Sequence, residues 1–139
     1  MSKNEMIQGL NDDLAGELGT IIRYTIQSSK AYGPRGAEVR ELLLEEVQDE
    51  LGHASFLADV IVDLGGEPTA TPQSFESTES LREMLDLNIN MEEQDVANYM
   101  KRSHLAEEMN NIELKVRLEE MAADESRHAR ELRRLAKGM

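Results

Sequence analysis

Apolar residues recur at helical spacing along most of the chain, and turn-forming residues interrupt this pattern in its first half. A first helix is predicted at about 4–31, and its apolar stripe consists of Ile7, Leu10, Leu14, Leu18, Ile21 and Thr25. Gly and Pro between 32 and 36 should end this helix, because neither residue continues a helix well. A second helix is predicted at about 37–64, before Gly65-Gly66. The short connection makes the two helices an antiparallel hairpin.

The second half of the chain repeats this layout after a polar loop. Residues 65–77 are rich in Pro, Ser and Thr, which predicts a long but structured crossover. Ser77 or Thr78 should cap a third helix that runs to a polar segment at 109–111. A fourth helix follows at about 114–135. The pattern therefore predicts an all-α fold, a four-helix bundle made of two antiparallel helical hairpins joined by a long crossover.

Residues of the types that bind metal recur at a constant offset of 75 positions. The chain has three histidines, and two of them follow a glutamate by three positions. The repeat pairs Glu17, Tyr24, Glu50 and His53 with Glu92, Tyr99, Glu125 and His128. Four coincident offsets in such residue types are hard to attribute to chance. The two halves of the chain therefore carry the same chemistry.

The repeated acids and histidines fall on the apolar stripes of the predicted helices. Glu17 lies three residues after Leu14 and four before Ile21, and His53 lies four before Leu57. Helical periodicity therefore directs four carboxylates and two imidazoles into the bundle, where leaving them unpaired would cost several kcal/mol each. The stripes offer no Lys or Arg to pair with them, which argues against simple salt bridges. Two divalent cations would balance the four carboxylates.

The predicted ligand set is rich in oxygen and supplies one imidazole for each ion. Such a set suits Fe or Mn, whereas structural Zn sites favour Cys or more His. The adjacent Glu93 should face solvent, because the repeat and the stripe both select Glu92. His104 follows a lysine by three positions and is expected at the surface. The predicted metal ligands, which are also the predicted catalytic residues, are Glu17, Glu50, His53, Glu92, Glu125 and His128.

Charge and composition exclude several classes of function. The formal net charge of −13 repels phosphate backbones, so no direct nucleic acid binding is expected. The absence of cysteine removes disulfides, thiolate metal sites and thiol catalysis. No apolar run approaches a membrane-spanning length and no signal-peptide core follows the N-terminus, so a cytoplasmic protein without a membrane partner is expected. A length of 139 residues suits a single domain, 1–139.

The order Glu, Glu-x-x-His, Glu, Glu-x-x-His on four successive helices resembles the ferritin-like di-iron superfamily. Within it the chain looks most like bacterioferritin over nearly its full length. The specific likenesses are Glu17-Leu18 with Tyr24, Gly66-Glu67-Pro68, Glu83-Met84-Leu85 and the 33-residue interval from Glu92 to Glu125. The resemblance implies two Fe ions per chain, with Mn as the alternative metal. It also implies a ferroxidase-type enzyme that oxidises Fe(II) with O2 or H2O2, for iron storage or detoxification in a homo-oligomeric shell.

The chain departs from bacterioferritin at three points. Leu51 occupies the position of the usual haem-ligating Met, so haem is not expected there. The sequence ends at Met139, which leaves no room for a fifth helix and favours a dimer-based oligomer or a small cage. Asp95 resembles the extra carboxylate of rubrerythrins, and a peroxide-reducing or other di-metal oxidoreductase without storage is the alternative function. Tyr24, Tyr99 and Asp95 are expected to contact the ligating carboxylates from outside.

Overall fold

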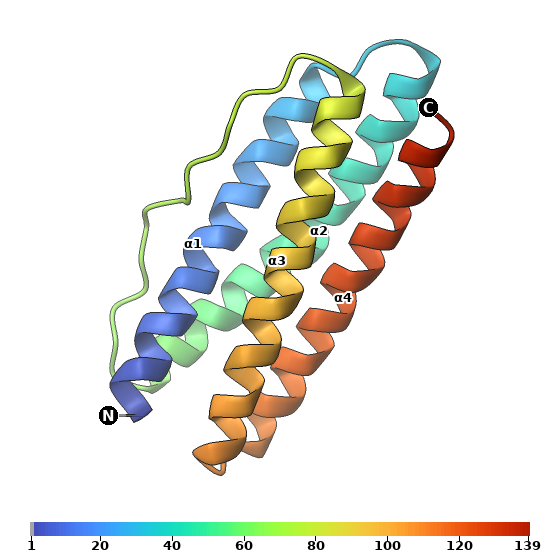
Figure 1. Cartoon of the computed structure of the whole chain (residues 1–139). Helices are drawn as coiled ribbons and strands as arrows, with labels where there is room; N and C mark the ends of the chain where they lie inside the picture. The colour runs from blue at the N-terminus through green and yellow to red at the C-terminus, as the bar shows by residue number, and fades with distance from the viewer. Residues whose placement is uncertain (1) are drawn as a thin grey trace.

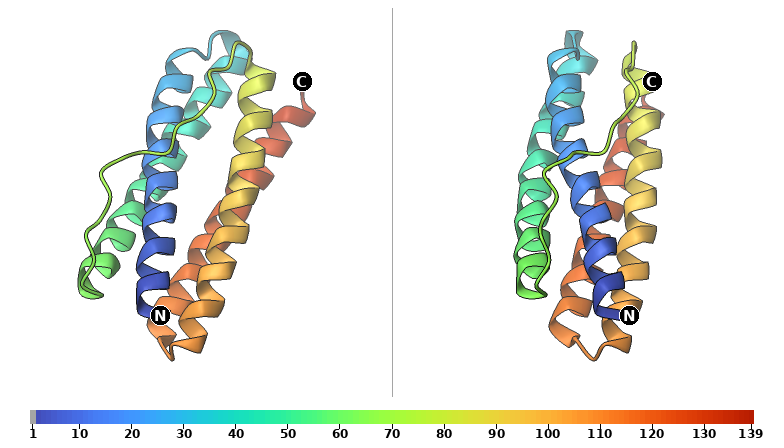
Figure 2. Two further views of the ribbon diagram at one scale, coloured as in Figure 1. Left: turned by 60° about the vertical axis from the view of Figure 1, so that its left-hand side comes forward. Right: turned by 90° about the vertical axis from the view of Figure 1, so that its left-hand side faces the viewer.

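The computed structural model describes residues 2–139 and places four long helices in one bundle (Figure 1). The helices are α1 (Ser2–Ser29), α2 (Gly33–Asp63), α3 (Leu81–Glu108) and α4 (Ile112–Lys137). Helices α1 and α2 form one antiparallel hairpin and α3 and α4 the other, and an extended crossover connects them (Figures 1 and 2). The predicted all-α, two-hairpin bundle is confirmed. None of the described helices is both long and apolar enough to span a membrane.

The helices pack most closely within each hairpin, whereas α2 and α4 approach each other at few points. The core consists of two apolar clusters at different levels. One contains Leu10, Leu57 and Leu118, and the other contains Val39 and Leu132. Each fully buried Leu or Val contributes roughly 1.5–3 kcal/mol relative to an exposed one. The repeated acids and histidines lie between the two clusters along every helix, so apolar packing on both sides holds a polar middle layer together.

Helix α2 begins four residues earlier than predicted. Its first residue is Gly33, with a φ of +78°, and Pro34 occupies the first turn. Proline is tolerated there because the first backbone N–H groups of a helix have no intrahelical acceptor. A Cβ atom at Gly36 would lie 2.6 Å from the carbonyl carbon of Ala31, so glycine is required for the close turn. The glycines and the proline that were predicted to lie between two helices therefore form the start of the second one.

The start of α3 also differs from the prediction. Neither Ser77 nor Thr78 caps the helix; Ser80 does, and its hydroxyl accepts a hydrogen bond from the Glu83 backbone N–H at 3.1 Å. The Glu83 carboxylate in turn accepts from the Glu79 backbone N–H at 3.0 Å. These two contacts satisfy the N–H of Glu83 in the first turn of the helix and the N–H of Glu79 just before the cap, neither of which has an intrahelical acceptor. Ser77, Thr78 and Ser80 all follow the last Pro of the crossover, and the sequence pattern did not distinguish Ser80 from the two earlier candidates.

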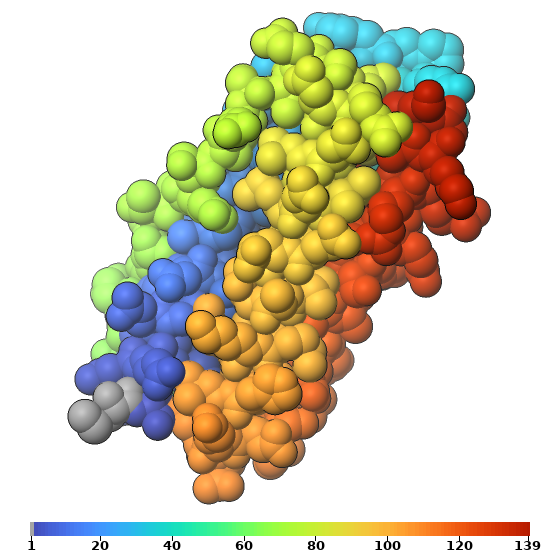
Figure 3. Space-filling view, viewed as in Figure 1, coloured from blue at the N-terminus to red at the C-terminus, as the bar shows by residue number. Residues whose placement is uncertain are grey.

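The crossover lies along α1 and is fixed to it, as predicted for a structured segment (Figure 3). The backbone N–H of Gln73 donates to the carbonyl of Ala15 at 2.8 Å. The side chain of Asn11 donates to the Glu67 carbonyl at 3.1 Å and accepts from the Thr69 N–H at 2.8 Å. These contacts are distributed along α1 and keep the two hairpins in one register.

The predicted stripe of α1 is wrong at Thr25, which is exposed. The helix instead buries Arg23, Tyr24 and Gln27 in this region. Hydropathy assigns polar side chains to the surface, so the buried Arg23 and Gln27 were not recognised as part of the inward face. Beyond Glu17, the buried face of α1 is therefore polar.

Candidate metal centre

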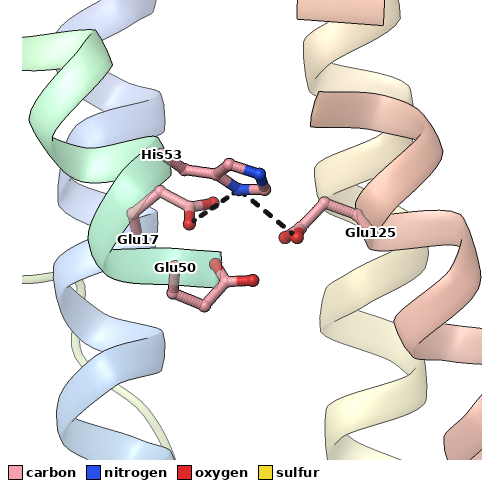
Figure 4. A group of neighbouring side chains, drawn as sticks. All are labelled: Glu17, Glu50, His53 and Glu125. Carbon is pink, nitrogen blue, oxygen red and sulfur yellow. Dashed lines mark ion pairs between the residues drawn. The ribbon is translucent and has the colours of Figure 1, made fainter. Parts of the chain in front are cut away.

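The six predicted ligands meet at one level in the middle of the bundle. Glu17 comes from α1, Glu50 and His53 from α2, Glu92 from α3, and Glu125 and His128 from α4. All six side chains are buried, and the most accessible is His53 at 5%. Figure 4 shows the carboxylates of Glu17 and Glu125 directed at one ring nitrogen of His53, with Glu50 beside them. Helical periodicity therefore placed each of these side chains on the correct face.

The ligand atoms form two groups that share two members. One group is Glu17, Glu50, His53 and Glu125, and the other is Glu50, Glu92, Glu125 and His128. Within each group the ligand atoms lie within 4.8 Å of one another. Glu50 and Glu125 belong to both groups, so they would lie between two adjacent ions if each group held one. Each position then has one glutamate and one histidine of its own.

The atoms that converge on these positions have no hydrogen-bond partner within the described residues 2–139. They are one or both carboxylate oxygens of every glutamate in the two groups, together with Nδ1 of His53 and of His128. A buried acceptor without a partner costs about 1–3 kcal/mol, and more when it is charged. Two divalent cations would offset this cost, because +4 balances four carboxylates. The donor set therefore fits two ions, and its oxygen-rich composition fits iron or manganese.

Each histidine contacts an aspartate of the other repeat through Nε2, the ring nitrogen that does not face the carboxylates of the site. His53 Nε2 lies 2.9 Å from Asp124 Oδ2, and His128 Nε2 lies 2.9 Å from Asp49 Oδ2. Arg127 Nη2 also donates to Asp49 at 2.6 Å. With Nε2–H donating to the aspartate, Nδ1 is free to face the ion, and such outer contacts fix the tautomer of metal-binding histidines.

The role of these two aspartates was not predicted from the sequence. The sequence does contain a sign of this role: the five-residue motif Asp-Glu-x-x-His starts at Asp49 and again at Asp124, with the same offset of 75 residues. Asp49 on α2 contacts His128 on α4, and Asp124 on α4 contacts His53 on α2, so each aspartate meets a histidine of the other hairpin. Its partner therefore becomes visible only when the neighbouring helix is in place.

The two tyrosines contact carboxylates of the site, again across the repeat. Tyr99 Oη donates to Glu17 Oε1 at 2.6 Å, and Tyr24 Oη donates to Glu92 Oε1. Burial raises the pKa of both phenols well above 10, so both remain protonated donors. Each hydroxyl occupies one oxygen of its glutamate and leaves the other to face the ion position.

The other acidic and histidine candidates lie outside the two groups. Asp95 is half-buried on α3, where burial and the charges of Glu17 and Glu92 raise its pKa well above 3.8. Glu93 is exposed and forms an ion pair with Arg133 at 3.5 Å. His104 is exposed, as expected.

One sequence-based statement is wrong: a basic residue does lie on the buried face. Arg23 is fully buried in α1, and its Nε donates to Asn88 Oδ1 at 3.0 Å. Its Nη2 donates to Thr20 at 3.3 Å, and the guanidinium carbon lies 5.2 Å from the centre of the Tyr24 ring. Among the described residues Arg23 pairs with no glutamate of the site, so it does not replace a cation in the charge balance.

Protons compete with metal for the same groups. Burial raises the pKa of Glu17 and Glu125 well above 4.5, and the neighbouring Glu50 adds to both increases. Burial alone lowers the pKa of His128, but the nearby carboxylates of Glu50 and Glu92 raise it to about 12. Without metal, the site therefore retains protons that the unfolded chain would release at neutral pH.

The metal-free protein is expected to lose stability as the pH rises from about 5 to 9. Glu17, Glu46, Glu125 and both histidines hold protons more tightly when folded, so the free energy of unfolding falls with rising pH. The loss begins above the ordinary glutamate value of 4.5 and passes through about 8 for Glu46. Each tenfold difference in proton affinity is worth about 1.4 kcal/mol.

Melting curves in the presence of a chelator would test this dependence, with Co²⁺ added in a parallel series. The melting temperature of the metal-free protein should fall across the interval. The increase caused by Co²⁺ should grow with pH, because the ion then displaces fewer protons. A metal-free melting temperature that rises from pH 5 to 9 would contradict the assignment of these groups.

Comparison with known proteins places this geometry in context. The sequence pattern of the ferritin-like domain family matches residues 7–139. A ferritin-like, diiron-carboxylate protein from Bacillus anthracis is 40% identical, with a TM-score of 0.95 and 98% of both chains covered. Bacterioferritin from Mycobacterium tuberculosis is 25% identical, with a TM-score of 0.81, covering 93% of this chain and 82% of that chain.

A dodecameric thioferritin from Bacteroides fragilis shares the fold at 20% identity, with a TM-score of 0.90 and coverage of 98% of this chain and 86% of that chain. No curated protein sequence matches the chain.

Proposed function

The chain belongs to the ferritin-like family, and on this basis we propose that it is a ferroxidase-type di-iron protein that oxidises Fe(II) with O2 or H2O2. The observation that carries the proposal is the pair of four-residue groups that share Glu50 and Glu125. The 40% identical structure from Bacillus anthracis is described as a diiron-carboxylate protein, which supports iron as the metal. Two adjacent iron ions can each supply one electron to a shared oxidant.

The roles of the protein side chains follow from their positions. Glu17 and His53 would hold one ion, Glu92 and His128 would hold the other, and the shared Glu50 and Glu125 would contribute to both. The hydrogen bonds from Tyr99 and Tyr24 orient the two unshared glutamates. The complete burial of the four carboxylates excludes bulk water, which strengthens their attraction for the ions.

We further propose that the protein stores or detoxifies iron in the cytoplasm as a symmetric homo-oligomer built from dimers. The outer faces of α1 and α2 support this proposal, because they expose large apolar side chains. Ile22 and Ile26 of α1 are 40% and 43% exposed, and Leu44 and Leu51 of α2 are 39% and 48% exposed. A second copy would cover such residues, which an isolated chain leaves in water.

A peroxide-reducing di-metal oxidoreductase without storage is the second candidate. The half-buried Asp95 favours it, because this residue is an extra carboxylate outside the two groups. Its pKa is raised by burial and by the charges of Glu17 and Glu92, so it lies close to the site. Such a protein would retain its two ions and turn over with an external reductant. The two candidates differ in how much iron each chain can process and retain.

Adding a large aerobic excess of Fe(II), followed by size-exclusion chromatography with iron analysis, distinguishes the candidates. We expect ferric iron to co-elute with a large assembly at many ions per chain. A dimer that stops at two ions per chain and consumes H2O2 repeatedly with added reductant would favour the second candidate. Anaerobic titration of folded protein that binds less than one Fe(II) per chain would contradict both.

A further inference from the structure

Glu46 is a fifth buried glutamate near the centre, outside the predicted ligand set. It lies on α2 one helical turn before Glu50 and is 2% exposed. In the part of the chain that the structure describes, neither of its carboxylate oxygens has a hydrogen-bond partner. Leaving a buried carboxylate without a partner costs several kcal/mol unless a proton or a cation neutralises it. The residue therefore needs a cation or a proton in the folded protein.

The Glu46 carboxylate is directed at one side of the site. Its Oε2 lies 3.9 Å from His128 Nδ1, the ring nitrogen that faces the second ion position. Two ligand atoms that bind the same ion, each at about 2.2 Å, are at most about 4.4 Å apart. Glu46 is therefore within reach of an ion held by His128. It is not one of the four residues of that group, whose ligand atoms all lie within 4.8 Å of one another.

The surroundings of the two histidines differ accordingly. His128 Nδ1 lies 3.2 Å from Glu50, 3.3 Å from Glu125, 3.6 Å from Glu92 and 3.9 Å from Glu46. The equivalent nitrogen of His53 has two carboxylates at comparable range, at 3.5 and 3.6 Å. More carboxylates therefore lie within 4 Å of His128 Nδ1 than of His53 Nδ1.

Most residues of the centre have a counterpart of the same type in the other half of the chain, whereas Glu46 does not. Every predicted ligand, both tyrosines and both supporting aspartates have counterparts 75 residues away. The counterpart of Glu46 is Met121, which is 1% exposed and belongs to an apolar cluster. A buried thioether occupies the place of a carboxylate at the first position. Glu46 therefore departs from the repeat, as does Asp95, whose counterpart is the buried Thr20.

We propose that Glu46 is an additional carboxylate ligand of the ion at the Glu92–His128 position, so that this position binds divalent cations more tightly than the Glu17–His53 position. The inference rests on the proposed two-ion function. It adds an order of occupancy: the second position fills first, and the first position completes the pair. An extra carboxylate raises affinity because oxygen donors suit hard cations and the added charge attracts them.

Calorimetric titration of metal-free protein with Co²⁺, without oxidant, tests the proposal independently of activity. The wild type should bind two ions in steps that differ at least tenfold in affinity. In Glu46→Gln the tighter step should weaken about 10–100-fold, while two ions still bind. Glu46→Met, which copies the other repeat, should bring the two affinities together. Glu45→Gln removes an adjacent exposed carboxylate and should leave both steps unchanged.

Single-position variants assign the step to its site. In a His53→Ala background the remaining ion should be sensitive to Glu46→Gln, whereas in a His128→Ala background it should not. Two Co²⁺ ions with the same two affinities in Glu46→Gln, Glu46→Met and wild type would overturn the inference and leave the two-ion function intact. Fewer than two ions in the folded wild type would instead overturn the two-ion function.

Discussion

Replacing Glu50 or Glu125 with alanine is expected to remove both ions from the site and to slow Fe(II) oxidation by more than about 100-fold. Both residues belong to both groups of ligand atoms, so either substitution damages two positions at once. Loss of residues that only support a metal ligand already costs about 10–100-fold in affinity or activity. Loss of a shared ligand removes charge and geometry together and should cost more.

Equilibrium dialysis with elemental analysis measures the ions bound, and stopped-flow absorbance measures the oxidation rate. Glu93→Ala is the matched control, because Glu93 neighbours a predicted ligand but is exposed and paired with Arg133. It should retain two ions and nearly the full rate. If Glu93→Ala lost its metal while Glu92→Ala retained it, the assignment of ligands on α3 would be wrong.

Unfolding can be separated from ligand loss in the same variants. Glu125→Ala removes a carboxylate whose pKa burial raises well above 4.5, so the metal-free variant avoids the cost of ionising it. At pH 8 the metal-free variant should therefore melt no lower than metal-free wild type. Adding Co²⁺ should then stabilise wild type and leave the variant unchanged.

Replacing His53 or His128 with alanine should retain one ion per chain and still abolish most of the Fe(II) oxidation. Each histidine belongs to one group, so the position of the other histidine keeps all four of its ligands. The proposed oxidation takes one electron from each of two adjacent ions, so a single ion cannot complete it. Residues that act as a unit lose function in a strongly non-additive way.

The double variant His53→Ala with His128→Ala should therefore oxidise Fe(II) no more slowly than either single variant, although it binds no ion. Stoichiometry and rate are measured on the same protein samples. A single variant that binds one ion and oxidises Fe(II) at half the wild-type rate would show that the positions act independently, which contradicts a paired site.

The partners of the ligands depended on the bundle itself. The repeat showed which residues carry the same chemistry but not which of them are in contact, and the structure brings Tyr24 to Glu92 and Asp49 to His128. These contacts join different helices, and their identity depends on which helices become neighbours. The same is true of the shared glutamates, since membership of two groups is a property of four helices together.

The sequence by itself determined the number of helices, the long crossover and the inward direction of six side chains, because helical periodicity and residue chemistry are local properties. It did not reveal that Arg23 and Glu46 are buried, because polar side chains on a single helix are assigned to the surface by default. It also missed the start of α2 at Gly33 and the Ser80 cap, where several local alternatives were equally compatible with the pattern. Only tertiary packing decided these points, because burial, pairing and the choice among local alternatives depend on the free energy of the whole bundle.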